Sequence, residues 1–278
     1  MGMAHDDGTI RAGELYPVAE ACGQTPEQVR SCLRRLVAEG LFARRGSGRE
    51  AVFEATDHGR ATLGYSAERT RLAYAQDAAG RGWDRRWHLA GLAVPEARRA
   101  ARDAARARLL ELGGARLQGG LYVSPHAWED DVRREIRRLG VSEHLLLVST
   151  DELEVAGERD PRELASKLWP LDHLADRYRS FVATYQRVPE TLEALRREHR
   201  RLSDTTFLPG ALGMAVAFQA CFDDDPLLPP ELLPRPWPGR EARDLVVRSR
   251  RLALLAREAS EHPAPFRLFD EIIRSTVP

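Results

Sequence analysis

Apolar positions near the start of the chain follow two helical patterns that are close together in sequence. Residues 12–22 and residues 25–39 each repeat apolar side chains three and four positions apart, which predicts one buried face on each helix. Thr25 is a good N-cap residue, and Gln28 can close a capping box back to it. Two helices joined by so short a connection predict a helix-turn-helix unit.

The pattern then changes from helical spacing to alternation. Residues 41–45 and residues 50–55 are predicted to be strands, and the segment Gly46-Ser47-Gly48 between them is a turn signal. A helix-turn-helix followed by a hairpin is the order of elements in a winged helix. The sequence therefore predicts a winged helix-turn-helix at the start of the chain.

A second series of alternating and helical segments follows Gly82. Its order is strand, helix, strand, strand, helix, strand, which predicts a ferredoxin-like βαββαβ domain. The predicted strands are residues 87–94, 115–118, 121–124 and 144–150, and the predicted helices are residues 96–112 and 127–139.

Beyond Pro161 the pattern is helical. Five helices are predicted, over residues 162–169, 171–185, 189–203, 212–222 and 240–258. The proline-rich segment 225–234 cannot be helical, so we expect an extended connection there.

The predicted fold class is α+β, with three domains. A winged helix-turn-helix domain spans residues 1–64, a linker residues 65–82, a ferredoxin-like domain residues 83–157, and a helical C-terminal domain residues 158–278.

Composition narrows the class of protein. The 278 residues are 43% hydrophobic and 30% charged, which is typical of a soluble globular chain. No run of about 18 apolar residues is present, so no membrane span is expected. The first residues lack the basic and apolar regions of a secretory signal. Three scattered cysteines do not predict a disulfide framework or a zinc site, and the expected location is the cytoplasm.

The net charge of zero hides local differences. Residues 28–49 contain six arginines against one glutamate, whereas residues 139–278 contain 19 cations against 23 acids. Steering of a charged partner depends on local charge. Because 41 of the 42 cations are arginine, the abundance of arginine is by itself weak support for any function.

The basic segment covers the second helix of the predicted helix-turn-helix, which would read DNA bases, and the hairpin that follows it, which would form the wing. Arginine can bond guanine edges and glutamine can bond adenine edges in a major groove, while arginines beside a wing turn can meet phosphates or a minor groove. An alternative interpretation is that these arginines only solvate an ordinary helix. The candidate DNA-binding residues are Thr25, Gln28, Arg30, Ser31, Arg34, Arg35, Arg44, Arg45 and Arg49.

No catalytic motif stands out. The chain lacks a glycine-rich phosphate loop, a His-Glu-x-x-His helix and a Gly-x-Ser-x-Gly elbow. A metal-dependent nuclease on the middle domain would need a carboxylate near the end of the first strand, where only Glu96 is available. The adjacent acids at 223–225 are predicted to solvate a helix end. We expect no enzyme activity, no cofactor and no metal site.

Several stretches spread over nearly the whole chain resemble the PaaX family of bacterial repressors of phenylacetate catabolism. The matching stretches are VRSCLRRL (29–36), VPEARR (94–99), LQGGLYVSP (117–125), LWPLD (168–172) and DPLLPPELLP (225–234). The resemblance implies a winged helix, a ferredoxin-like middle domain and a helical C-terminal domain. It also implies a homodimeric repressor that binds a double-stranded DNA operator and is released by an acyl-CoA effector such as phenylacetyl-CoA.

The resemblance does not place the effector pocket. We expect it near Trp169, Arg177 and Tyr178, because an aromatic wall beside a guanidinium suits an aryl acyl-CoA. Two other functions remain open at this point. One is the metal-dependent nuclease on the middle domain, and the other is a winged helix that binds protein and not DNA.

Overall fold

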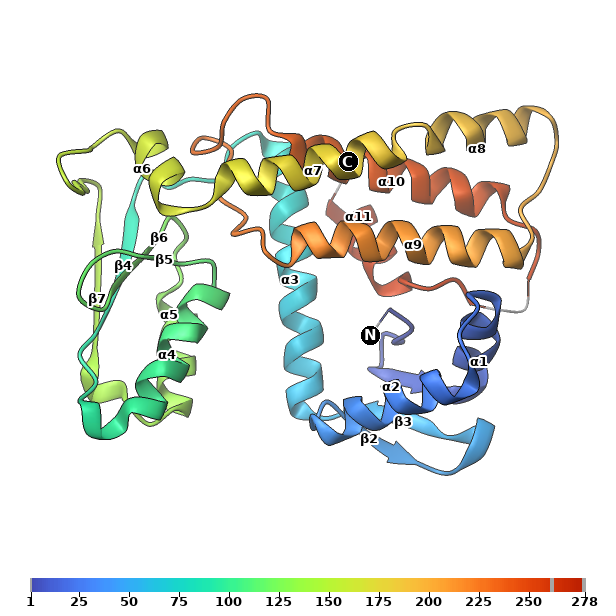
Figure 1. The fold of residues 1–278 in the computed structure, drawn as a ribbon, viewed down its shortest axis with the longest axis horizontal. Helices are drawn as coiled ribbons and strands as arrows, with labels where there is room; N and C mark the ends of the chain where they lie inside the picture. Colours follow the sequence, from blue (N-terminus) through green and yellow to red (C-terminus); the bar gives the residue numbers. More distant parts are fainter. Residues whose placement is uncertain (1, 261–262, 277–278) are drawn as a thin grey trace. The chain divides into compact units, whose positions relative to one another are not determined.

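The computed structural model describes residues 2–260 and 263–276 and divides into two compact units. Unit 1 comprises Met1–Ala78, Tyr178–Ala220 and Pro238–Pro278, and unit 2 comprises Ala79–Arg177 and Cys221–Trp237. Figure 1 shows both units with their helices and strands. Each unit is described by itself.

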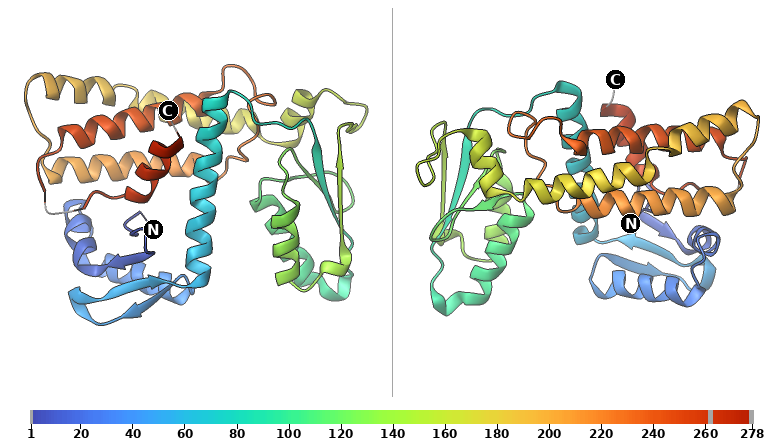
Figure 2. Two further views of the ribbon diagram at one scale, coloured as in Figure 1. Left: turned by 180° about the vertical axis from the view of Figure 1, so that it is seen from behind. Right: turned by 45° about the horizontal axis from the view of Figure 1, so that its top comes forward.

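The first part of unit 1 is a small sheet with two helices. Its elements, in chain order, are β1 (Thr9–Arg11), α1 (Ala12–Ala21), α2 (Pro26–Ala38), β2 (Phe42–Arg45), a 3₁₀ turn (Gly48–Glu50) and β3 (Val52–Ala55). The sheet is antiparallel with the order β1-β3-β2. Figure 2 shows these elements in blue from two further sides. The hairpin of β2 and β3 places Arg44 opposite Phe53.

Local sequence explains where α2 begins and ends. The Thr25 hydroxyl accepts a hydrogen bond from the Gln28 backbone N–H at 3.3 Å, and the Gln28 side-chain oxygen accepts one from the Thr25 N–H at 2.7 Å. This reciprocal pair is a capping box. Beyond the helix, Gly40 has φ +70°, a conformation that glycine adopts without strain. Val29 and Leu33 of α2 are buried in the core of this part of unit 1.

A long helix, α3 (Asp57–Ala79), follows the hairpin. The segment expected to be a linker, residues 65–82, is therefore largely helical. Its residues include many alanines and arginines, which favour helix. Leu63 of α3 is buried against the core of the first part of the unit. Near its other end, Asp77 forms a buried ion pair with Arg243 of α10 (Pro238–Ala256).

The other helices of unit 1 come from the C-terminal half of the chain. They include α8 (Val188–Arg197), α9 (Asp204–Phe222) and α11 (Arg267–Thr276), while α7 (Leu171–Tyr185) belongs partly to each unit. Helix α9 begins eight residues before the predicted start at 212, with Pro209 inside it. By length and composition alone α9 is apolar enough to cross a membrane, a test that a core helix of a soluble protein also passes.

Contacts at the start of α9 explain why it begins there. Asp204 accepts hydrogen bonds from Arg257 at 2.8 Å, and the Arg257 guanidinium lies 4.6 Å from the centre of the Phe207 ring. Phe207 and Leu208 are buried in one cluster with Val18 of α1. The helices from the C-terminal half thus pack directly on the N-terminal part of unit 1.

Unit 2 is built on a four-stranded antiparallel sheet with the order β5-β6-β4-β7. The strands are β4 (Trp87–Leu92), β5 (Ala115–Arg116), β6 (Leu121–Ser124) and β7 (Leu145–Thr150), and the helices between them are α4 (Arg99–Glu111) and α5 (Glu129–Arg138). A 3₁₀ turn at Glu96–Arg98 precedes α4, so the predicted helix 96–112 is interrupted at its start.

Alternation along β4 divides its side chains between two cores. Ala90 and Leu92 pack with Leu109 of α4 and Ile136 of α5 in one cluster. Trp87 belongs to another cluster, with α6 (Pro161–Leu168) and with Leu228 and Leu232 of the proline-rich segment. No helix or strand is assigned to residues 225–234, as the prolines predict.

The α+β class and the helical C-terminal region are confirmed. The grouping into two compact units reflects contacts within each unit, and the expected domain boundaries stay predictions.

Candidate nucleic-acid interface

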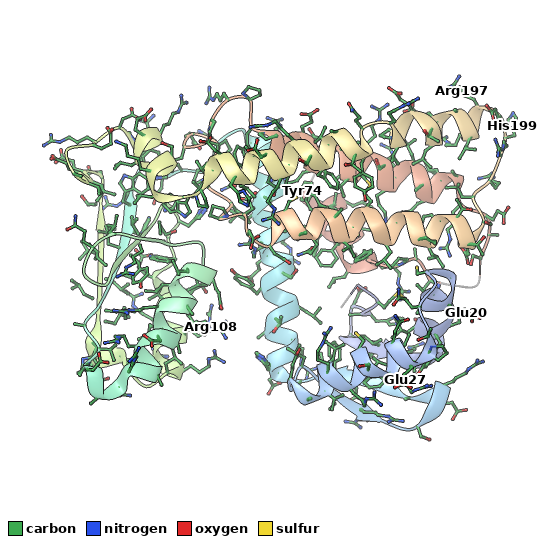
Figure 3. All side chains as sticks on the ribbon, viewed as in Figure 1. Glu20, Glu27, Tyr74, Arg108, Arg197 and His199 are labelled. Carbon is green, nitrogen blue, oxygen red and sulfur yellow. The ribbon has the colours of Figure 1, made fainter. Side chains whose placement is uncertain are left out.

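Two arginines on α2 share one carboxylate. Arg30 donates to Glu27 through Nε at 3.0 Å and Nη2 at 2.7 Å, and Arg34 donates to the other oxygen of Glu27 at 3.1 Å. The hydrogen bonds from Arg30 and then from Arg34 lower the pKa of the Glu27 carboxyl, and the same contact raises the pKa of Arg30. These three side chains, on the helix that Figure 3 marks with Glu27, therefore carry a net charge of one.

The hairpin contributes arginines of two kinds. Arg45 pairs with Glu54 across the strands at 2.8 Å. Within the described residues, Arg44 and Arg49 have no carboxylate within 4.0 Å of the guanidinium. The hairpin thus presents two guanidinium groups whose charge is not neutralised by a neighbouring acid.

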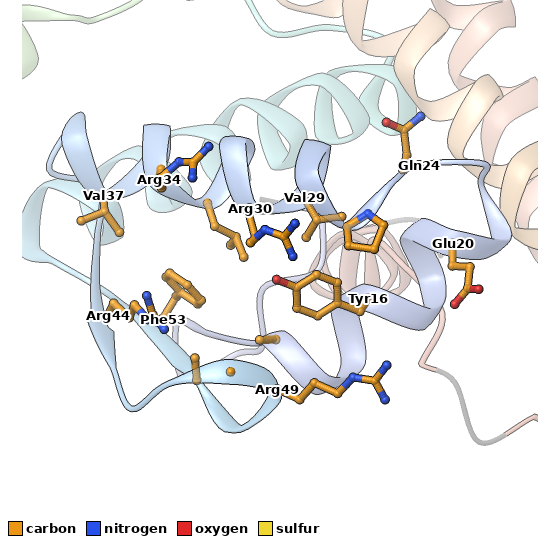
Figure 4. Close-up of a pocket in the computed structure, with 15 residues that line it drawn as sticks. Tyr16, Glu20, Gln24, Val29, Arg30, Arg34, Val37, Arg44, Arg49 and Phe53 are labelled. Carbon is orange, nitrogen blue, oxygen red and sulfur yellow. The ribbon is translucent and has the colours of Figure 1, made fainter.

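These four arginines meet around a groove. The groove has a volume of about 630 Å³ and lies between α1, α2 and the hairpin (Figure 4), and we call it the α2–hairpin groove. Arg30 and Arg34 come from α2, Arg44 from β2 and Arg49 from the 3₁₀ turn. The other lining residues are Ala12, Tyr16, Glu20, Gln24, Pro26, Val29, Leu33, Val37, Gly48, Ala51 and Phe53.

The remaining candidates lie on α2 or the hairpin but outside the groove. Thr25 and Gln28 are engaged in the capping box. Because a bidentate bond to adenine needs both an acceptor and a donor, the cap competes with adenine reading for the Gln28 oxygen. Ser31 and Arg35 are exposed on α2, with Arg35 Nε 3.9 Å from Glu39.

Sequence reasoning missed the apolar part of the groove. Tyr16 of α1 and Val37 of α2 line it, and Val37 remains 37% exposed although it continues the apolar spacing of the helix. In the sequence, the signal is only that Val37 continues the apolar spacing of the helix. Its exposure becomes visible in the structure. Only the tertiary arrangement shows that α1 and the hairpin border the same opening.

The three residues expected near an effector have packing roles. The Trp169 indole N–H donates to the Gly113 carbonyl at 3.0 Å, and the ring stacks on Trp87 with centroids 6.5 Å apart. Arg177 pairs with Asp224. Tyr178 is fully buried in the other unit, so the proposed pocket remains a prediction based on residue chemistry.

The acids considered for metal chemistry have other contacts. Glu96 accepts a hydrogen bond from Arg102 at 2.5 Å, and buried Asp225 accepts one from the Leu227 N–H at 2.8 Å. In residues 2–260 and 263–276, no group of three histidine, cysteine or acidic side chains is placed to hold a metal ion.

Comparison with known proteins decides the family. The family model described as the PaaX protein central Cas2-like domain matches residues 80–165, and the PaaX-like protein C-terminal domain matches residues 169–263. Together these matches cover more than half of the chain. The chain belongs to the PaaX family.

Two other proteins are similar to this chain over most of its length. The transcriptional repressor PaaX of Escherichia coli (strain K12) is 25% identical over 245 residues, which is 88% of this chain and 74% of that protein. A solved structure, the uncharacterized protein Rv0674 from Mycobacterium tuberculosis, is 21% identical with a TM-score of 0.48, covering 95% of this chain and 90% of that one. Similarity to a PaaX repressor supports a regulator without enzyme activity.

The matches to the two PaaX models begin at residues 80 and 169, both after the candidate interface. The similarity to the Escherichia coli repressor extends further. Because residues 80–278 number only 199, at least 46 of the 245 aligned residues precede residue 80. The N-terminal part of unit 1 is thus included in the relationship to a transcriptional repressor.

Proposed function

We propose that this PaaX-family protein is a transcriptional repressor that binds double-stranded DNA through a winged helix-turn-helix at residues 1–64. Helix α2 is the reading helix, and the hairpin of β2 and β3 is the wing. The observation that carries the proposal is the meeting of four arginines from α2 and the hairpin around one groove. Similarity to a transcriptional repressor supports it.

The proposal extends to the rest of the molecule. Residues 83–157 are proposed as the ferredoxin-like domain, supported by the element order of unit 2 and the strand order β5-β6-β4-β7. We propose a homodimer, whose two reading helices would enter successive major grooves about 34 Å apart on an inverted repeat. A repressor of this kind acts in the cytoplasm.

The regulated pathway and the effector are also part of the proposal. Family membership supports control of phenylacetate catabolism. An acyl-CoA thioester such as phenylacetyl-CoA, bound near Trp169, Arg177 and Tyr178, would release the repressor if it binds the DNA-free state more tightly. This location is supported only by residue chemistry, because aromatic side chains and a guanidinium group suit an aryl acyl-CoA.

The reading helix can be tested with Arg34→Ala combined with Arg35→Ala. Binding of the purified chain to its own promoter region is measured by electrophoretic retardation at several salt concentrations. We expect affinity to fall by about tenfold to a hundredfold, because a good base contact contributes about 1–3 kcal/mol. The dependence on salt should also become less steep, since fewer phosphate contacts release counterions.

The matched control is Arg133→Ala combined with Arg134→Ala, two consecutive exposed arginines on α5. These substitutions should leave DNA affinity unchanged. Equal affinity of the α2 variant and the wild type would refute the assignment of α2 as the reading helix. A wild-type chain that retards no DNA at low salt but captures a partner protein would instead favour the protein-binding winged helix.

A further inference from the structure

The α2–hairpin groove contains an apolar floor that contact with a DNA backbone does not require. Val29, Leu33 and Phe53 form part of the core and also line the opening, and Val37 is more exposed than these three. In Figure 4 the Tyr16 ring lies across the opening from Val29 and Arg30. The three core residues are only 5–7% exposed, so the apolar surface open to an occupant comes mainly from Val37 and from the half-buried Tyr16 ring.

Charge at the edge of the same groove is strongly one-sided. Four arginines line it against a single acid, Glu20. Arg30 and Arg34 share the Glu27 carboxylate, whereas Arg44 and Arg49 have no acid within 4.0 Å in the part of the chain that the structure describes. Because both guanidinium groups are exposed and lack an acidic neighbour, a negatively charged occupant gains charge-assisted hydrogen bonds there.

We propose that the α2–hairpin groove binds an amphipathic anion, a molecule with a hydrocarbon or aryl body that ends in a carboxylate. The body covers Val37 and the Tyr16 ring, and the carboxylate accepts hydrogen bonds from Arg44 or from Arg49, which line separate ends of the groove (Figure 4). Inorganic phosphate has no apolar body and would leave Val37 and Tyr16 uncovered. A cation would be repelled by the arginines. The volume of about 630 Å³ lies within the range usual for small-molecule sites.

Because the groove lies at the proposed DNA-binding surface, a bound anion would affect the affinity for DNA. Arg30, Arg34, Arg44 and Arg49 line the groove and are also the arginines assigned to DNA. An anion seated there therefore competes with DNA for the same guanidinium groups. This coupling rests on the proposed function, whereas binding of the anion does not.

Calorimetric titration of the full chain in the absence of DNA tests binding directly. Three probes share one hydrocarbon chain and differ in the head group: decanoate, 1-decanol and decyltrimethylammonium. We expect decanoate to bind with one site per chain, decanol to bind more weakly and the cation not to bind. Equal binding of decanoate and decanol, or no binding of decanoate, overturns the proposal.

Variants connect binding to the groove. Arg44→Gln combined with Arg49→Gln should weaken decanoate binding by about fivefold, the scale of one partly exposed ionic contact. The matched control is Arg35→Gln combined with Arg45→Gln, because these residues are on the same elements but do not line the groove. An equal loss of affinity in both pairs would show a general charge effect and refute the site.

Val37→Glu tests the apolar side of the groove. The substitution places a carboxylate at an exposed helical position and should abolish decanoate binding through repulsion. Thermal unfolding checks that each variant is folded, and the wild type should unfold at a higher temperature when decanoate is present. Unchanged decanoate binding by a folded Val37→Glu chain contradicts the proposal.

Retardation of promoter DNA with and without decanoate separates this inference from the proposed function. Decanoate should release DNA from the wild type, and 1-decanol at the same concentration should not. If decanoate binds but no DNA is retarded, the proposed function fails and the anion site stands. If DNA is retarded but decanoate neither binds nor releases it, the anion site fails and the proposed function stands.

Discussion

Glu27 sets the charge that α2 offers to a partner. Its carboxylate binds both Arg30 and Arg34, and its position in the first turn also suits the positive end of the helix dipole. The arginines are thereby held in fixed directions at the cost of part of their charge. A DNA phosphate that approaches them must compete with this carboxylate.

Replacing Glu27 with glutamine should tighten binding to DNA of any sequence by a few-fold. The substitution removes one negative charge from the interface, so the salt dependence should also become steeper. Because the arginines lower the pKa of Glu27, its carboxylate is ionised throughout about pH 5 to pH 8. The difference between variant and wild type should therefore be constant over that range, as measured by fluorescence anisotropy.

Glu39→Gln is the matched control for this prediction. Glu39 lies on the same helix end as Arg35 but is 3.9 Å from it and does not line the groove. It should change affinity less than Glu27→Gln does. A Glu27→Gln chain that binds DNA more weakly than the wild type would show that the carboxylate positions the arginines more than it neutralises them.

At the scale of one element, α2 depends on its capping box. Thr25→Ala removes the hydroxyl that accepts from the Gln28 N–H, and we expect a loss of about 1 kcal/mol in the free energy of unfolding. Thr25→Ser keeps the acceptor and should lose much less. Urea unfolding followed by circular dichroism measures both variants. An equal loss in the two would mean that the Thr25 methyl group, and not the hydroxyl, stabilises this end.

Local signals explain which elements could be predicted. The helix predicted over 25–39 is observed at Pro26–Ala38, because the cap and Gly40 mark both ends within a few residues. Helix α3 was not predicted, since its buried face includes Gly59, Thr70 and Gln76 beside apolar residues, so no apolar repeat marks the helix in the sequence. Helix α9 was predicted too short because Pro209 is a breaker signal, although the contacts of Asp204 and Phe207 extend the helix past it.

Part of the candidate interface could be predicted, because its charged residues are also local signals in the sequence. The basic residues of 28–49 are visible in sequence, and the spacing of Glu27 from Arg30 already predicts a helical ion pair. The α2–hairpin groove was not predictable, because Tyr16, Val37 and Phe53 are brought together only by the packing of three elements. Long-range apposition of this kind has no local signature.

At the scale of the whole molecule, a buried ion pair joins α3 to α10 in unit 1. The Arg243 guanidinium donates to Asp77 at 2.5 and 2.8 Å, and the two side chains are 6% and 12% exposed. The nearby Tyr74 side chain is 4% exposed, and this burial raises the pKa of its hydroxyl. The pair fixes the helix that follows the hairpin to the C-terminal helices.

Asp77→Asn should destabilise unit 1 by about 1.5–3 kcal/mol, because it removes the carboxylate that accepts two hydrogen bonds from the buried Arg243 guanidinium, while the Asp244 carboxylate still interacts with that guanidinium. Asp77→Leu combined with Arg243→Met removes both charges and should restore most of the loss. Chemical unfolding of the full chain measures the three proteins. Equal instability of the single and double variants would mean that packing, and not charge, dominates at this position.

The chain passes between the two units several times, and this limits which segments relatives can exchange by recombination. The boundaries at 78/79, 177/178, 220/221 and 237/238 mean that neither unit is encoded by one continuous stretch of gene. A recombination event that joined a foreign segment at residue 78 would also replace Asp77, the partner of Arg243. The N-terminal segment should therefore be exchanged between relatives only where both supply this acid and this arginine, whereas substitutions within α2 leave the ion pair in place.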